Sequence, residues 1–136
     1  GHKKLGVKFY LYVDDLDKVV TKNDRDPSNG SYAVGFCRTI EADEENKNLS
    51  ANQLKERNHK GITLPERLLL GAGFYVATGQ HLDMVNITLC TGSRDSDGHV
   101  PSVSWRSDAR RVDVDWFYPG SSIDSIRSRS AVSLPV

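Results

Sequence analysis

Alternating hydrophobic and polar residues near the N-terminus predict a β-strand. The run Val7–Val13 has a period of two, which places one face of an extended segment against a core. A second strand is expected over Ser31–Ile40, where the apolar positions alternate again. The polar stretch 15–30 between them is dense in turn-forming residues and is expected to be an exposed connection.

The strongest helix signal lies in the middle of the chain, at Thr63–Gly79. Thr63 and Glu66 have the spacing of a capping box, and Pro65 lies in the first turn, where its missing amide costs no hydrogen bond. Gly79 suits a left-handed C-terminal cap. Because the helix is apolar almost all round, we expect it to be buried on most sides.

Two expectations follow from that burial. Gly71 and Gly73 each cost about 1 kcal/mol of helix propensity relative to alanine, which indicates that another segment packs very close to them. The substitution Leu69→Asp is expected to unfold the protein, since an unpaired charge in an apolar site is very costly.

Shorter elements flank the central helix. Ser50 and Gln53 form a second capping box, which predicts a short surface helix near Ala51–Arg57. Beyond the central helix, Met84–Cys90 alternates between apolar and polar residues and predicts a third strand.

The C-terminal part of the chain is rich in strand signals. Val100–Trp105 and Val112–Tyr118 predict two strands of a hairpin with one core face and one exposed face. Before them, Asp97-Gly98 is a strong hairpin-turn signal. The tail Ser121–Val136 fits either a turn of helix or an edge strand.

Together these elements predict an α+β fold. We expect a mostly antiparallel, curved sheet of about five to six strands packed on one buried apolar helix, Thr63–Gly79. A length of 136 residues fits one domain spanning residues 1–136. A sheet wrapped around a central helix resembles the hot-dog arrangement of thioesterases and dehydratases, a likeness of fold that does not fix function.

Composition narrows the classes of function. Lys plus Arg is 18 and Asp plus Glu is 18, so the chain offers no global attraction to nucleic acid or to an anionic membrane. No apolar run approaches the roughly 18 residues that span a bilayer, and no secretion signal follows the N-terminal basic residues. A soluble cytoplasmic protein is therefore expected, with Cys37 and Cys90 as buried thiols.

One stretch of sequence stands out from the rest. It reads HLD at His81–Asp83 and TLCTGSRDSDGHVP at Thr88–Pro101, and it resembles small conserved bacterial proteins of no known activity. The resemblance implies a bacterial origin and carries no function.

The ligand-binding candidates fall in the same stretch. They are Arg94, Asp95, His99 and His81. The turn Ser93–His99 is the densest cluster of polar residues that core packing does not explain. The guanidinium of Arg94 can bind an anion through two hydrogen bonds, and His99 can titrate near neutral pH. The alternative is that this segment is only a solvated hairpin tip.

No metal or cofactor is expected. Asp95-Ser96-Asp97-Gly98 looks like part of a calcium loop, but the position that needs a bidentate carboxylate holds Ser104. The chain also lacks the paired Cys or His spacing of a zinc site.

These observations favour a non-enzymatic binding or interaction module. We expect a homodimer, with a small anion as candidate ligand. The alternative is a small hydrolase or isomerase with a pocket between sheet and helix, near His81, Asp95 or His99. A closed, dry core would favour the first and a polar-lined cavity the second.

Overall fold

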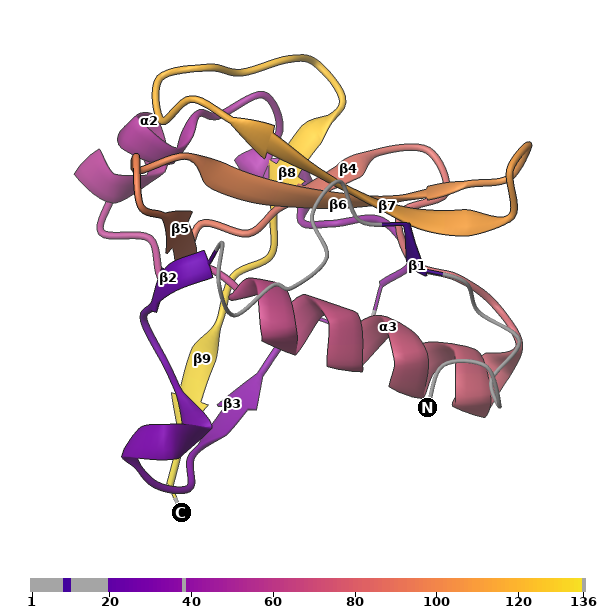
Figure 1. Cartoon of the computed structure of the whole chain (residues 1–136), viewed down its shortest axis with the longest axis horizontal. Coiled ribbons are helices and arrows are strands. Elements are labelled where there is room, and N and C mark those ends of the chain that lie inside the picture. The colour runs from indigo at the N-terminus through magenta and orange to yellow at the C-terminus, as the bar shows by residue number, and fades with distance from the viewer. Residues whose placement is uncertain (1–8, 11–19, 38, 136) are drawn as a thin grey trace.

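The computed structural model describes residues 9–10, 20–37 and 39–135 of the chain (Figure 1). Its helical elements in this part are η2 (Pro27–Asn29), η3 (Glu44–Asn46), α2 (Ala51–Glu56) and α3 (Leu64–Thr78). Its strands are β1 (Phe9–Tyr10), β2 (Val20–Asn23), β3 (Ala33–Gly35), β4 (Ile87–Leu89), β5 (Ser93–Asp95), β6 (Val100–Arg106), β7 (Arg111–Phe117), β8 (Ile126–Ser128) and β9 (Val132–Leu134).

The strands form one main sheet and two small ribbons. The main sheet has the order β1-β7-β6-β4-β8; its central pairs are antiparallel, and the outer pairs β1–β7 and β4–β8 are parallel. The ribbons are β2–β5 and β3–β9, both antiparallel. The predicted α+β class is confirmed, with mostly antiparallel pairing.

The hairpin of β6 and β7 organises the principal core. Its register pairs Val103 with Val114 and Trp105 with Val112, so these side chains share one face, as the alternation predicts. That face packs toward α3, and the buried residues of this core are Val20, Ile62, Leu64, Cys90, Val103, Val112 and Val114.

A second, smaller core lies on the other face of the sheet. Ala51 of α2 is buried there with Leu89, Val100 and Ile126, and Phe117 packs against them. Figure 1 shows α2 above the sheet and α3 below it. The hairpin face that we expected to be exposed is therefore covered at its α2 end, where Ser102 is buried.

The predicted helix boundaries are confirmed by the capping contacts. In α2 the Ser50 hydroxyl accepts from the Gln53 N–H and the Gln53 side chain accepts from the Ser50 N–H. Thr63 and Glu66 make the same reciprocal pair at the start of α3. The helix ends at Gly79, which has a left-handed φ of 73°.

The expected burial of α3 on most sides is not found. The sheet lies against one side of the helix and does not wrap it, and the exposed fractions of Leu69 and Val76 are 71% and 65%. The reason given for unfolding by Leu69→Asp is therefore wrong.

The two helix glycines also differ from expectation. A Cβ at Gly73 would meet open space, whereas a Cβ at Gly71 would collide with Nη1 of Arg67, one turn earlier in the same helix. No neighbouring segment requires either glycine. Gly71 instead leaves room for the Arg67 side chain, which lies along α3.

Several strand predictions need correction. Among the described residues of Ser31–Ile40, a strand forms only at β3, and Met84–Cys90 contains a strand only at β4. Asp97-Gly98 does form a tight turn, but it joins β5 to β6, which belong to different sheets, so it is not a hairpin ladder. Apart from β1, the predicted strand Val7–Val13 lies outside the described residues.

The structure also tests the expectations for the two cysteines and for the C-terminal tail. Cys90 is buried as predicted, but Cys37 is exposed. The C-terminal tail contains the predicted edge strand as β9, together with β8, which the sequence did not suggest. In the described part of the chain, no helix is long and apolar enough to cross a membrane.

Candidate functional site

A polar cleft of about 250 Å³ opens between α2, the β2–β5 ribbon and the segments that precede α3 and follow β4. Elements far apart in sequence contribute to it, because β2 pairs with β5 and thereby places residues of the N-terminal third beside the Ser93–His99 turn. Its lining residues are Lys22, Asp24, Ala51, Leu54, Lys55, His59, Lys60, Thr91 and Arg94.

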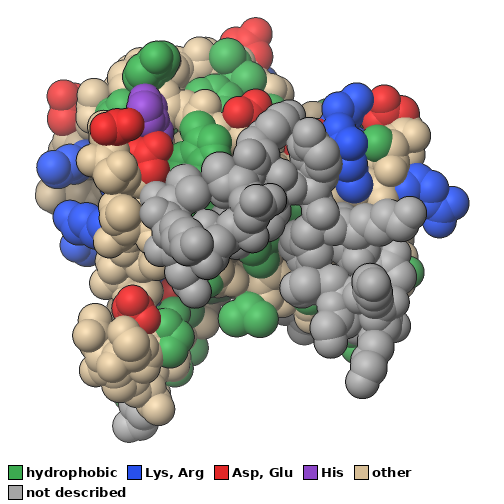
Figure 2. All heavy atoms as spheres, viewed as in Figure 1, with side chains coloured by type: hydrophobic (Ala, Val, Ile, Leu, Met, Phe, Trp, Pro, Cys, Tyr) green, Lys and Arg blue, Asp and Glu red, His purple; other side chains and the backbone are tan. Residues whose placement is uncertain are grey.

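The cleft concentrates positive charge. Its lining contains the four cations Lys22, Lys55, Lys60 and Arg94 but only one carboxylate, that of Asp24. The chain as a whole is neutral, so this imbalance is local. Figure 2 shows basic side chains at the left edge of the molecule, on the side of α2, with acidic side chains close by. Such a concave cationic surface attracts anions.

Arg94 is the fixed cation of the cleft. Its Nη1 donates to the carbonyl oxygens of Thr91 at 2.7 Å and Ser93 at 2.8 Å, which holds the guanidinium in place. Its Nε and Nη2 donate to no other residue that the structure describes. Burial lowers the pKa of Arg94, and the nearby Asp24 charge opposes that effect. The side chain therefore presents oriented N–H groups to a ligand.

The strand that carries Arg94 is anchored by its neighbour. The buried Ser93 hydroxyl accepts a hydrogen bond from the Leu64 N–H at 2.8 Å and donates to Oδ1 of Asn23. These bonds tie β5 to the start of α3 and to β2. The position of Arg94 is therefore set by the core and not by the loop alone.

Two glycines bring the walls of the cleft together. A Cβ at Gly61 would collide with the Thr91 hydroxyl, and a Cβ at Gly92 would collide with the Gly61 carbonyl oxygen. The Gly92 N–H donates to the Ile62 carbonyl at 3.0 Å across the same contact. Neither approach could occur with a larger residue, so both glycines serve close backbone packing.

A chain of polar side chains leads from the cleft into the protein. The Oγ of Ser128 lies 2.8 Å from Nε2 of His59 and 3.2 Å from Oγ1 of Thr91. Ser128 is fully buried, while His59 and Thr91 line the cleft. Burial lowers the pKa of His59, although the charges of Asp43 and Glu45 oppose the shift.

Asp95 and His99 contact each other and build the turn. Oδ1 of Asp95 accepts from the backbone N–H groups of Asp97 and His99, and its Oδ2 lies 2.8 Å from Nδ1 of His99. Burial alone would raise the pKa of Asp95, but these hydrogen bonds lower it overall. Of the predicted turn cluster, only Arg94 is among the residues lining the cleft.

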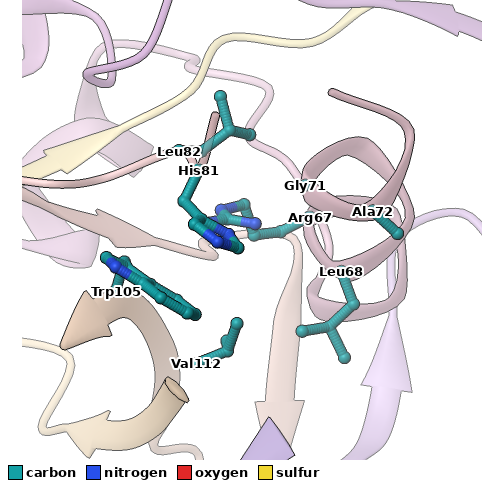
Figure 3. A pocket seen from close by; sticks show the side chains of 8 residues that line it. All are labelled: Arg67, Leu68, Gly71, Ala72, His81, Leu82, Trp105 and Val112. Atoms are coloured by element: carbon teal, nitrogen blue, oxygen red, sulfur yellow. The ribbon is translucent and has the colours of Figure 1, made fainter. Parts of the chain in front are cut away.

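His81 lies at a different place, in the stack that Figure 3 shows in part. Its ring is stacked between Tyr75 and Trp105, with centroid distances of 4.7 Å and 3.5 Å. Burial lowers the pKa of His81, and the charges of Arg67 and Arg110 lower it further. His81 is therefore not part of the cleft that contains Arg94.

Sequence reasoning missed a buried charge network behind this stack. The Asp83 carboxylate accepts from Nε of Arg67 at 2.8 Å, from Nη2 of Arg129 at 2.8 Å and from the Thr88 hydroxyl at 2.7 Å. Arg129 also donates to the carbonyl oxygens of Thr39 and Ile40. The only sequence signal was an aspartate in the His81–Asp83 segment; nothing in the polar tail indicated that Arg129 is completely buried.

Within the described residues, no group of three or more His, Cys, Asp or Glu side chains is placed to hold a metal ion. Comparisons of the chain with protein-family models, with curated proteins and with solved structures give no match. The interpretation of the cleft therefore depends on its geometry and charge.

Proposed function

We propose that the protein is a non-enzymatic binding module that holds a small polyanion in the cationic cleft. The observation that carries the proposal is the half-buried, pre-oriented guanidinium of Arg94, surrounded by three lysines. Arginine suits bidentate contacts with phosphate or carboxylate oxygens, and lysines add point charges. The Thr91 hydroxyl supplies a further donor at the cleft wall.

The proposed ligand carries more than one negative charge. A cleft of about 250 Å³ has room for a ligand of the size of pyrophosphate or citrate. Its exposed lysines are screened by salt, so binding should weaken as ionic strength rises. Arg94 is more buried and should retain most of its contribution.

The test is titration calorimetry with inorganic pyrophosphate at low ionic strength. Hydrogen bonds to charged groups contribute about 1.5–3 kcal/mol, so Arg94→Gln should weaken binding about tenfold or more. Arg106→Gln is the matched control, because Arg106 pairs with Asp108 and Asp113, outside the cleft. Absence of binding by the parent protein, or equal losses in both variants, would contradict the proposal.

The hydrolase alternative has one observation in its favour, the contact of His59 with Ser128. A histidine beside a hydroxyl is the arrangement that activates a nucleophile. Ser128 is fully buried, however, so a substrate could reach only Thr91. Turnover of an activated phosphate or carboxylate ester that is lost in both His59→Gln and Thr91→Val would favour this alternative over the binding module.

The expected homodimer and cytoplasmic location remain proposals. Self-association is supported by exposed apolar side chains on α3 and β9. They are Leu69, Val76, Val132 and Leu134. Patches of this kind on a small protein usually mark contact surfaces.

A further inference from the structure

The buried network around Asp83 carries an excess of positive charge. Asp83 is the one carboxylate that pairs with both Arg67 and Arg129 in the described part of the chain. Arg129 directs its remaining donors to Thr88 and to backbone carbonyls. A buried charge without a counter-charge is costly, so the second guanidinium needs a further partner.

The terminal nitrogens of Arg67 are the unused donors of this network. Only Nε donates, to Asp83; Nη1 and Nη2 have no acceptor among the residues that the structure describes. The Arg67 side chain is only 3% exposed, so little of it is open to bulk solvent. Figure 3 shows it reaching from α3 toward His81.

A small cavity lies beside Arg67. Its volume is about 20 Å³, and its walls are formed by Arg67, Leu68, Gly71, Ala72, His81, Leu82, Trp105 and Val112. Most of these are apolar side chains or ring faces, and no carboxylate is among them. The cavity thus combines an uncompensated cation with an apolar enclosure.

We propose that this cavity is a binding site for a small monovalent anion, held by Nη1 and Nη2 of Arg67 beside the His81–Trp105 stack. The site shares no lining residue with the cationic cleft and goes beyond the function proposed for it. A cavity of about 20 Å³ accommodates an ion of the size of chloride or the carboxylate group of formate, and it excludes larger organic anions. A single negative charge neutralises the network.

Two glycines of α3 provide matched variants for the test. In Gly71→Ala the new methyl group would collide with Nη1 of Arg67 and displace it from the cavity. Gly73→Ala makes the same change two residues along the same helix, where a Cβ meets open space. Both variants add the same helix propensity, so only the position of Arg67 distinguishes them.

The measurement is the melting temperature as potassium gluconate is replaced by chloride or formate at constant ionic strength. A ligand that binds only the native state raises the melting temperature with the logarithm of its concentration. We expect this rise in the parent and in Gly73→Ala and its loss in Gly71→Ala. Comparison of the chloride and formate series shows which anion the cavity prefers.

The same series in Arg94→Gln separates this site from the cleft. If the melting temperature of Arg94→Gln still rises in chloride or formate, the anion binds in the cavity. This holds whether or not the variant binds pyrophosphate. A rise that disappears in Arg94→Gln, or that survives in Gly71→Ala, overturns the proposal, as does the absence of any rise in the parent. In crystals soaked in bromide, an anomalous peak beside Arg67 supports it, and a cavity that contains only water refutes it.

Discussion

At the scale of single residues, the buried ion pairs are the feature with the largest consequences. Asp83 holds two arginines that come from α3 and from the end of the chain, and its backbone has a positive φ of 57°. Its N–H donates to the Ile40 carbonyl, and its own carbonyl accepts from the Trp105 N–H. One residue thus joins four distant segments.

Removing the charge of Asp83 should therefore destabilise the fold strongly. In Asp83→Asn two buried guanidinium groups lose their counter-charge, and breaking a buried pair in this way costs about 3–5 kcal/mol. The free energy of unfolding in urea measures the loss. Asp108→Asn is the control, since Asp108 pairs with Arg106 on the surface and its replacement should leave stability unchanged. Similar stabilities for the two variants would show that the network is dispensable.

The two half-buried histidines predict a loss of stability in mild acid. Burial holds the pKa values of His59 and His81 below their ordinary value of 6.5 in the folded state. As the pH falls below 6.5, the unfolded chain takes up protons before the folded one does, so the free energy of unfolding decreases. Above that pH the full stability is present.

Urea titrations from about pH 7.5 to about pH 5 would measure this slope. The variants His59→Gln and His81→Gln should each flatten it, because each removes one group whose pKa differs between the two states. A slope that both variants leave intact would assign the effect to other groups.

At the scale of elements, α3 is a helix with one buried side. Its first turn is enclosed, since Leu64, Glu66 and Arg67 are buried, whereas Leu69 and Val76 are exposed. A helix that is apolar all round is usually covered all round. Here the sheet covers the side that faces β6 and β7, and Leu69 and Val76 remain exposed.

Two leucines of α3 separate these sides experimentally. Leu64→Asp places a charge in the closed core and should unfold the protein. Leu69→Asp changes a residue that is 71% exposed and should leave the circular dichroism spectrum and the cooperative melt intact. Unfolding by both substitutions would restore the original expectation of a helix enclosed on most sides.

At the scale of the whole molecule, α3 and the β3–β9 ribbon both carry exposed apolar side chains. Two grooves of about 280 Å³ and 610 Å³ flank the helix, and Leu69 and Leu70 line both. The ribbon adds the exposed Val132 and Leu134 and leaves unpaired strand edges. Surfaces and edges of this kind promote association.

Sedimentation velocity at high micromolar concentration should therefore report a dimer. Leu69→Asp and Val76→Asp should shift the protein toward the monomer without loss of helix content, because both alter the exposed side of α3. Val132→Asp tests whether the ribbon takes part. A parent protein that sediments as one chain would refute self-association.

Local structure could be predicted from the sequence because its causes are local. The capping boxes of α2 and α3, the left-handed end of α3 at Gly79 and the facing of the β6–β7 hairpin all depend on residues within a few positions of one another. The α+β class followed from these elements. Arg94 could be singled out because the turn itself gives it no role.

The tertiary structure alone decided which of these groups meet. Lys22 and Arg94 face one cleft only because β2 pairs with β5, and Arg129 is buried only because β8 pairs with β4 and carries it to Asp83. Pairing between distant segments leaves no periodic pattern in either segment. The sequence therefore does not distinguish a buried arginine from one in an exposed polar tail. The exposure of Leu69 was hidden for the same reason: hydrophobicity predicts a need for burial, but only packing shows which side of a helix is covered.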